Sequence, residues 1–153
     1  MGVEIERKFL VRDDTWRAGA VGHTIRQGYL SCDPSAVVRV RICRDKGYLT
    51  VKGLAAGLAR PEFEYDIPLP EAEQLLTMCG ARLIEKTRYE VVLAGLRWEV
   101  DVFSGENAGL VVAECELESV DQEISHPAWL GDEVSDDPRY ANSNLATNPF
   151  TTW

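Results

Sequence analysis

Charged and apolar side chains alternate along one segment after another of this 153-residue chain. Successive side chains of a β-strand point to opposite faces, so each such segment predicts a strand with one charged and one apolar face. Near the N-terminus, Glu4, Glu6 and Lys8 share one face, and Ile5 and Phe9 share the other. The same pattern predicts eight strands, over residues 3–11, 22–30, 36–44, 47–53, 61–67, 82–93, 96–103 and 110–119.

Turn and helix signals agree with a chain made mainly of strands. Asp45-Lys46-Gly47 predicts a hairpin turn between the third and fourth strands, and Ala94-Gly95 predicts another between the sixth and seventh. A helix is expected from Pro70 to a stop at Gly80, with short helices near residues 15–16 and 138–146 and a mobile loop over 53–60. The expected fold is therefore a large antiparallel sheet or barrel.

The charges are sorted by sign along these strands. Arg39 and Arg41 share one face, whereas Glu114, Glu116 and Glu118 share another. Like charges repel when they are neighbours in a sheet, so this sorting indicates cations bound near the glutamates and a polyanion bound near the arginines. A solvated outer face would also alternate, and that interpretation stays open. If the sheet closes into a barrel, one lumen gathers six cationic residues, namely Lys8, Arg39, Arg41, Lys52, Lys86 and Arg88.

Composition narrows the class of protein. No stretch approaches the roughly 18 apolar residues of a membrane span, and the acidic N-terminus does not resemble a signal peptide, so a cytoplasmic protein is expected. The four cysteines are scattered without a CxxC pair, which disfavours a zinc site or a disulfide framework. A net charge of −9 argues against nonspecific binding to nucleic acid.

The motifs on these strands resemble a known family. The Glu4-x-Glu6-x-Lys8 pattern is similar to the signature of the CYTH, or triphosphate tunnel metalloenzyme, superfamily. The similarity continues in order along nearly the whole chain, through Arg26-Gln27-Gly28-Tyr29-Leu30, Val38-Arg39-Val40-Arg41, Leu49-Thr50-Val51-Lys52-Gly53, Arg60-x-Glu62-Phe63-Glu64, Lys86-Thr87-Arg88-Tyr89, Trp98-Glu99-Val100-Asp101, the segment 109–118, Trp129-Leu130-Gly131 and, more loosely, Tyr140-x-Asn142-x-x-Leu145.

This resemblance implies a fold and an activity. The expected fold is α+β dominated by β: a closed, eight-stranded antiparallel β-barrel with a few outer helices, in which residues 1–153 form a single CYTH domain. The length resembles that of the compact bacterial single-domain branch, which includes inorganic tripolyphosphatases. The implied activity is that of a metal-dependent hydrolase, using Mg²⁺ or Mn²⁺, that converts tripolyphosphate to diphosphate and phosphate.

The resemblance also implies roles for single residues. Phosphate ligands are expected at the six cations of the lumen, and Lys8, Glu114, Glu116 and Tyr29 are the expected catalytic residues. Glu4, Glu6 and Glu116 are the first expectation for the metal that holds the substrate. A further set is expected to hold a second ion, to position the attacking water or to orient the basic residues, and it consists of Glu62, Glu64, Asp101, Glu114 and Glu118.

Other functions stay open on the sequence. The same tunnel could serve an adenylate cyclase or a thiamine triphosphatase, and a cyclase would need a dedicated ribose and base site. A non-catalytic polyphosphate-binding module would keep the basic residues and lose a metal-binding carboxylate, yet every such carboxylate is present. The expected partner is a small triphosphate, without nucleic acid or membrane, and an apolar outer surface is compatible with a homodimer.

Overall fold

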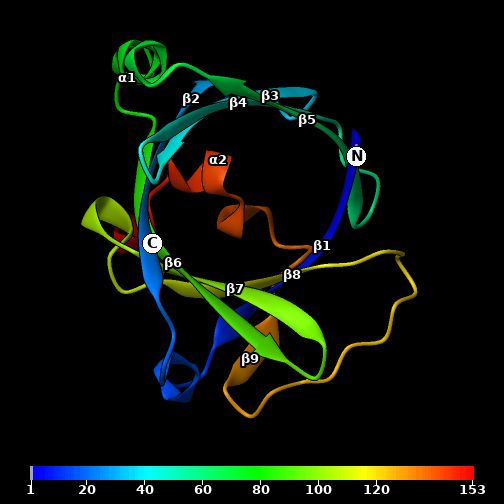
Figure 1. Ribbon diagram of the computed structural model, residues 1–153. Coiled ribbons are helices and arrows are strands. Elements are labelled where there is room, and N and C mark those ends of the chain that lie inside the picture. The colour runs from blue at the N-terminus through cyan, green and yellow to red at the C-terminus, as the bar shows by residue number, and fades with distance from the viewer. Residues whose placement is uncertain (1) are drawn as a thin grey trace.

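The computed structural model describes residues 2–153 and contains one antiparallel sheet that closes on itself (Figure 1). The strand order is β5-β4-β3-β2-β6-β7-β8-β1, and β1 pairs again with β5, so these eight strands form a closed barrel. The predicted eight-stranded barrel is confirmed. The strands are β1 (Gly2–Val11), β2 (Gly22–Ser31), β3 (Ala36–Cys43), β4 (Lys46–Gly53), β5 (Ala59–Ile67), β6 (Leu83–Leu93), β7 (Leu96–Phe103), β8 (Val111–Glu116) and the additional β9 (Leu130–Glu133).

Strand β1 closes the barrel because different parts of it pair with different strands. Residues 2–5 pair with β5, residues 6–10 pair with β8, and the end of β1 pairs with β9. The four-residue strand β9 was not predicted, since it is too short to show an alternating pattern. It approaches β1 closely at Gly131, where a Cβ atom would lie 3.0 Å from the carbonyl oxygen of Leu10.

The hairpin turns show one agreement and one difference. Ala94 and Gly95 form the turn between β6 and β7 with φ values of 51° and 75°, as predicted. The turn between β3 and β4 lies one residue earlier than predicted, at Arg44 and Asp45, whose φ values are 52° and 60°. Positive φ at both central residues is the geometry that matches the twist of a two-residue hairpin, and Cys43 pairs with Lys46 across it.

The helices are short and lie around the barrel. Helix α1 (Leu69–Thr77) packs on the outer face of β3 and β4, where Ala72 and Leu76 contact Val40 and Ile42. The other helical segments are η1 (Thr15–Arg17), η2 (Gly105–Asn107), η3 (Pro138–Tyr140), α2 (Asn142–Leu145) and η4 (Phe150–Thr152). The short helices predicted near residues 15–16 and 138–146 are thus present. Within residues 2–153, no helix combines the length and the hydrophobicity needed to cross a membrane.

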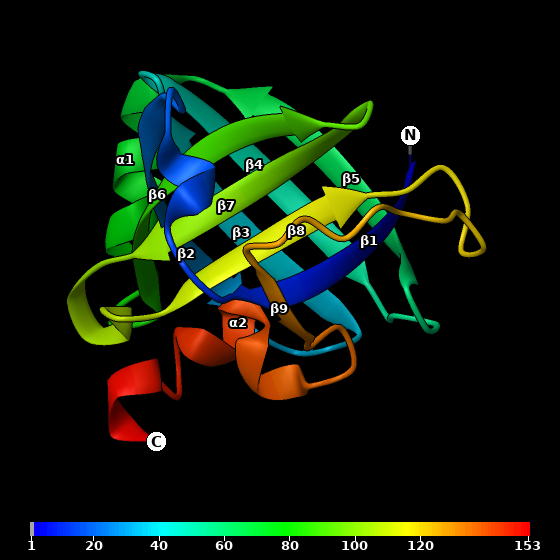
Figure 2. The same cartoon turned by 90° about the horizontal axis from the view of Figure 1, so that it is seen from below.

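Apolar side chains cover the outside of the barrel and also fill one of its ends. An outer cluster of Phe9, Trp98 and Trp129 follows the expected outward apolar face. In a second apolar cluster, Leu145 from the chain after β9 packs against inward-facing apolar residues near the strand ends, such as Phe103. Figure 1 shows α2 inside the outline of the barrel, and Figure 2 shows it at one end, so this C-terminal segment lies across that end. Charged side chains line most of the rest of the lumen.

Candidate active site

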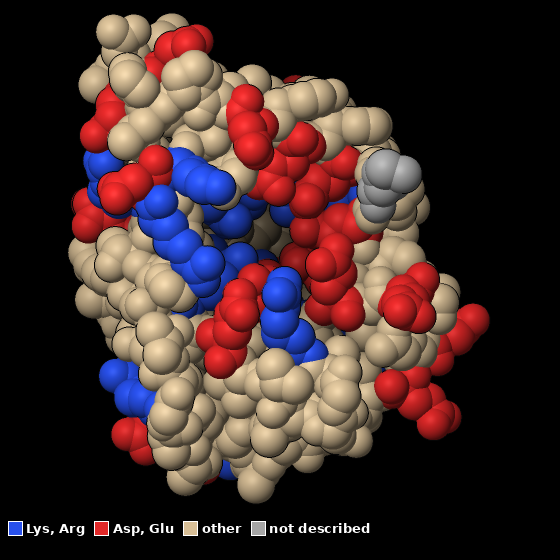
Figure 3. Space-filling model, in the orientation of Figure 1, with Lys and Arg blue, Asp and Glu red and all other residues tan. Residues whose placement is uncertain are grey.

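The barrel encloses a cavity of about 430 Å³ with a strongly charged lining. The inward positions of the strands supply most of the lining, because side chains two residues apart share a face. Eight lining residues are basic and eight are acidic: Lys8, Arg39, Arg41, Lys52, Arg60, Lys86, Arg88 and Arg97 against Glu4, Glu6, Glu62, Glu64, Glu99, Glu114, Glu116 and Asp137. Figure 3 shows the two signs gathered on opposite sides of the central hollow.

Lys86 and Arg88 share one buried carboxylate, Asp101. The Lys86 ammonium lies 2.7 Å from Asp101 Oδ2, and the Arg88 guanidinium donates to Asp101 from Nε at 2.7 Å and from Nη2 at 2.8 Å. Burial would raise the pKa of Asp101, but Lys86 and Arg88 outweigh burial and hold that pKa well below its ordinary range. Burial lowers the pKa of Lys86 to about 7. Asp101 raises this pKa, whereas the positive charges of Arg88 and Arg41 lower it further. Asp101 thus fixes the two cations from behind the cavity wall.

Arg39 and Arg41 add two more cations beside this pair. Arg41 donates from Nε to Gln27 Oε1 at 2.8 Å, and its pKa is lowered to about 10 by burial and by the charges of Arg39 and Arg88. Arg39 donates from Nη2 to Thr50 Oγ1 at 3.1 Å, yet its buried Nε has no acceptor among residues 2–153. A buried donor without a partner is costly, so this donor fits the oxygen of a bound anion.

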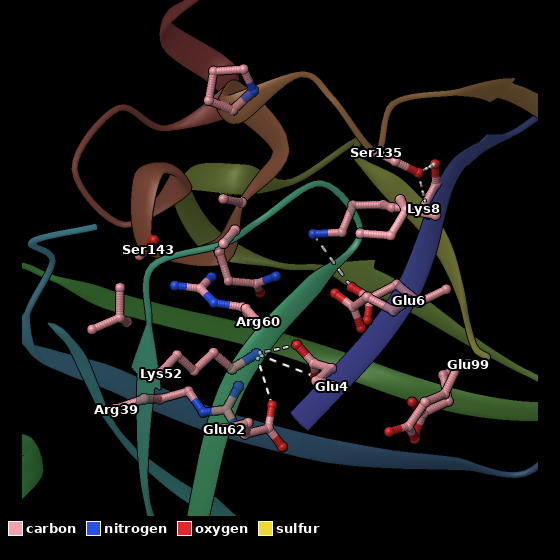
Figure 4. Close-up of a pocket in the computed structure, with 18 of the residues that line it drawn as sticks. Glu4, Glu6, Lys8, Arg39, Lys52, Arg60, Glu62, Glu99, Ser135 and Ser143 are labelled. Atoms are coloured by element: carbon pink, nitrogen blue, oxygen red, sulfur yellow. Dashed lines mark hydrogen bonds and ion pairs between the residues drawn. The ribbon is translucent and has the colours of Figure 1, made fainter. Parts of the chain in front are cut away.

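The facing wall carries a cluster of carboxylates around Lys52. The Lys52 ammonium lies 3.1 Å from Glu4 Oε1 and 3.2 Å from Glu62 Oε2, and Figure 4 shows it between these two side chains. Burial raises the pKa of Glu4, and a hydrogen bond with Glu62 raises it further. Burial raises the pKa of Glu6 to about 8, with added repulsion from Glu114 and Glu4. Glu6 therefore lacks enough positive charge nearby to ionise fully at neutral pH, whereas the Lys52 ammonium opposes the upward pKa shift of Glu4.

The glutamates of β8 sit directly across from β1. Glu116 pairs with Glu6 and Glu114 pairs with Lys8 in the sheet register. The Lys8 ammonium lies 3.5 Å from Glu114 Oε1. Although burial opposes ionisation, Lys8 and Arg88 lower the pKa of Glu114 to about 2. Glu114 is therefore an ionised carboxylate paired with the Lys8 ammonium.

The carboxylates suit a hard divalent cation only when other ligands contribute. Among residues 2–153, no three Asp, Glu, His or Cys side chains converge closely enough to hold a metal by themselves. Mg²⁺ is usually held by one or two carboxylates together with waters and substrate phosphates, so this arrangement is consistent with such a site. The raised pKa values of Glu4 and Glu6 point to the same place, because a cation there would offset the repulsion.

The structure brings together nearly all the residues singled out in the sequence. Thirteen line the cavity: Glu4, Glu6, Lys8, Tyr29, Arg39, Arg41, Lys52, Glu62, Glu64, Lys86, Arg88, Glu114 and Glu116. Asp101 lies behind the wall, with both oxygens bound to cations.

Glu118 does not lie on the strand predicted over residues 110–119. Strand β8 ends at Glu116, not at residue 119, and Leu117 makes one further bond to β1, from its backbone N–H to Ile5 O. Glu118 is exposed beyond this point and does not line the cavity, so its expected role as a metal ligand stays a prediction.

Several lining residues had no role assigned from the sequence. Arg60 lies opposite Glu4 across β1 and β5 and donates to Gly53 O at 2.8 Å. Glu99 was visible in the strand alternation, and it lies 3.3 Å from Arg88. Ser135 and Asn142 come from the segment after β9, where no periodic pattern marks an inward position. Asn142 belongs to the loosely matched Tyr140-x-Asn142-x-x-Leu145 motif, which gave it no role, and only the docking of this segment places both side chains at the cavity.

Comparison with known proteins agrees with this geometry. The CYTH domain family matches residues 2–144. A protein of Acetivibrio thermocellus named inorganic triphosphatase is 50% identical over 98% of this chain and 97% of its own length. An inorganic triphosphatase of Nitrosomonas europaea is 39% identical over 94% of this chain and 96% of its own length.

Solved structures show the same fold. The crystal structure of an inorganic triphosphatase superposes with a TM-score of 0.68 at 37% identity, covering 94% of this chain and 93% of the other. A conserved hypothetical protein of Pyrococcus furiosus, at 21% identity, is similar in fold alone, with a TM-score of 0.59 over 77% of this chain and 80% of its own. The family match over nearly the full length and the curated relatives show that this chain belongs to the CYTH domain family.

Proposed function

We propose that this protein is a divalent-metal-dependent triphosphatase that hydrolyses inorganic tripolyphosphate to diphosphate and phosphate inside the barrel. The observation that carries the proposal is the lumen itself, in which a wall of cations faces a wall of carboxylates in a cavity of about 430 Å³. Relatives named inorganic triphosphatase, at 50% and 39% identity, support the same activity.

The basic wall binds the phosphate chain in this proposal. The arginine forks suit the paired oxygens of a phosphate, and the lysines add compact charges. The unpartnered Nε of Arg39 supports this role most directly, because an anion would satisfy it. The proposed phosphate ligands are Arg39, Arg41, Lys86 and Arg88 of the basic wall, together with Lys8 and Lys52, which lie among the carboxylates.

The acidic wall holds the metal, for which we propose Mg²⁺ or Mn²⁺. Metal dependence is a general feature of the family, and Glu4, Glu6 and Glu116 are the proposed ligands, to be completed by waters and substrate phosphates. Glu62 and Glu64 are proposed as further carboxylates for a second ion or for positioning the attacking water. A divalent ion held there supplies positive charge to the phosphate oxygens where negative charge develops. Asp101 acts instead on Lys86 and Arg88, whose positions it fixes.

In this proposal, residues on β1, β2 and β8 position the attacking water and stabilise the leaving diphosphate. Water attacks the terminal phosphorus, the bond to the bridging oxygen breaks and diphosphate leaves, a reaction that mainly requires alignment and charge stabilisation. We propose that Glu116 orients the water, and that Lys8, held by Glu114, neutralises the departing oxygen. The Tyr29 hydroxyl accepts from Gln27 Nε2 at 3.0 Å, which leaves its own O–H free to donate to phosphate.

The lining favours a bare triphosphate over a nucleotide. Of the side chains described as lining the cavity, Tyr29 is the sole aromatic one, and it is buried. A cyclase would require a surface on which to place a base and a ribose, whereas a tripolyphosphatase requires only the charged groups. The thiamine triphosphatase and cyclase alternatives therefore receive no specific support from the site.

One experiment tests the proposal. The protein is incubated with tripolyphosphate, thiamine triphosphate or ATP, with Mg²⁺, with Mn²⁺ or with a chelator, and the products are separated by chromatography. We expect orthophosphate and diphosphate from tripolyphosphate with metal only. Glu6→Gln should abolish this turnover, while Glu85→Gln, an exposed outward glutamate on β6, should retain it. Cyclic AMP as the main product, or binding without turnover, would contradict the proposal.

The wider setting is also proposed. Residues 1–153 form one CYTH domain, supported by the family match over residues 2–144 and by a single closed sheet. The protein acts in the cytoplasm on a small triphosphate, without nucleic acid or membrane. Exposed Val3, Phe63 and Tyr65 on neighbouring strands are compatible with a homodimer.

A further inference from the structure

Two amide side chains link the basic wall to the C-terminal segment. Asn142 Oδ1, on α2, accepts from Lys86 Nζ at 2.9 Å and from Gln27 Nε2 at 3.3 Å. Gln27 Oε1, on β2, accepts from Arg41 Nε at 2.8 Å. Each amide oxygen thus receives a hydrogen bond from a cation, and the two amides are bonded to each other.

We propose that Asn142 and Gln27 are positioning residues that hold Lys86 and Arg41 in place for the phosphate chain, so that the C-terminal segment is part of the binding site and not only its cover. This inference rests on the proposed function, because it assumes that these two cations bind phosphate.

The environment of Lys86 explains why it needs a second partner. Its side chain is 1% exposed and consists of a flexible four-carbon stem that ends in the ammonium. With Asp101 as its one acceptor, at 2.7 Å, the ammonium could still rotate about the axis of that contact. An ammonium has three donors, and Asp101 and Asn142 accept two of them. The third donor then remains, and because Lys86 lines the cavity we expect it to donate to a phosphate oxygen.

The chemistry of an amide suits this position better than a carboxylate. A neutral oxygen accepts from a cation without cancelling its charge, so Lys86 and Arg41 stay attractive to an anion. A second carboxylate beside Asp101 would neutralise Lys86 and repel the phosphate chain. Gln27 is 1% exposed and also donates to Tyr29 Oη at 3.0 Å, so its orientation is fixed on both sides.

The C-terminal segment makes a second contact of the same kind. The backbone oxygen of Tyr140 accepts from Lys8 Nζ at 3.1 Å. Nearby, Leu145 is 0% exposed and Tyr140 is 9% exposed within the apolar cluster at this end of the barrel. The apolar contacts dock the segment, and the docked segment presents two oxygens to two lysines of the lumen.

Asn142→Ala tests the inference, with Asn144→Ala as the matched control. Both asparagines lie on α2, but within residues 2–153 Asn144 Nδ2 donates only to Pro138 O, in the same segment. Asn142→Asp keeps an oxygen for Lys86 and serves as a conservative variant. The readouts are the NMR signal of the Lys86 ammonium, assigned by its loss in Lys86→Arg, and calorimetric binding of tripolyphosphate to the protein in chelator, where no turnover occurs.

We expect Asn142→Ala to lose the ordered Lys86 signal and to bind tripolyphosphate about tenfold more weakly, the usual effect of losing a hydrogen bond to a charged group. Asn144→Ala should change neither readout, and Asn142→Asp should restore the signal but not the affinity, because it adds a negative charge. An unchanged Lys86 signal in folded Asn142→Ala would overturn the inference. A lost signal with unchanged affinity would uphold the positioning and overturn the phosphate-binding role of Lys86, which separates the two proposals.

Discussion

The Asp101 carboxylate offers the sharpest test of how this lumen is held together. It is 0% exposed and bonds to both Lys86, which is 1% exposed, and Arg88. Asp101→Asn keeps the size of the side chain but removes its charge, and it places an NH₂ donor against groups that can only donate. Leaving buried charge without its partner costs about 3–5 kcal/mol. For a chain of this size, that cost lowers the melting temperature by about 6–20 °C.

Denaturant unfolding of Asp101→Asn at neutral pH measures this cost. The control is Glu73→Gln, which breaks a pair of the same length, 2.7 Å, whose side chains are 47% and 51% exposed. An exposed pair contributes at most about 1 kcal/mol, so the control should unfold close to the wild type. Adding Lys86→Met to Asp101→Asn should recover part of the loss, because one unpaired cation is removed. Equal unfolding midpoints for Asp101→Asn and the wild type would refute this reasoning.

Three further predictions concern the lumen and its closed end. Leu145→Ala should lower the free energy of unfolding by about 2–5 kcal/mol, since the side chain is 0% exposed. If Leu145→Ala lowers it by no more than Leu54→Ala, a change at an exposed leucine, the C-terminal segment does not dock as described. The pKa of Glu6 is raised to about 8 by burial and by Glu114 and Glu4, against 4.5 ordinarily, so the folded protein keeps a proton that the unfolded chain releases. Stability in chelator should therefore fall as the pH rises from 4.5 to about 8, and Glu6→Gln should flatten this slope in unfolding experiments at several pH values. Arg39→Lys should raise the KM for tripolyphosphate about tenfold with little change in melting temperature, because the two-pronged donor is lost while the charge is kept; an unchanged KM would argue against phosphate binding at Arg39.

Local sequence determined which side chains share a face. Glu4, Glu6 and Lys8 lie together in the lumen because a strand repeats every two residues, a rule that depends only on neighbours in the chain. The same rule grouped Arg39 with Arg41, and the ordered motifs identified the family. These features are encoded within short segments, which is why they could be predicted.

Tertiary structure decided what local patterns left open. A charged strand face could have faced solvent, and only the pairing of β1 with both β5 and β8 turned it into the wall of a lumen. The end of β8 removed Glu118 from that lumen, and the docking of the segment after β9 brought in Asn142. Strand periodicity arises between adjacent residues, whereas barrel closure and the docking of the C-terminal segment arise from contacts between residues far apart in the chain. Gly2 pairs with Glu62 on β5, and Lys8 bonds to Tyr140, 132 positions away.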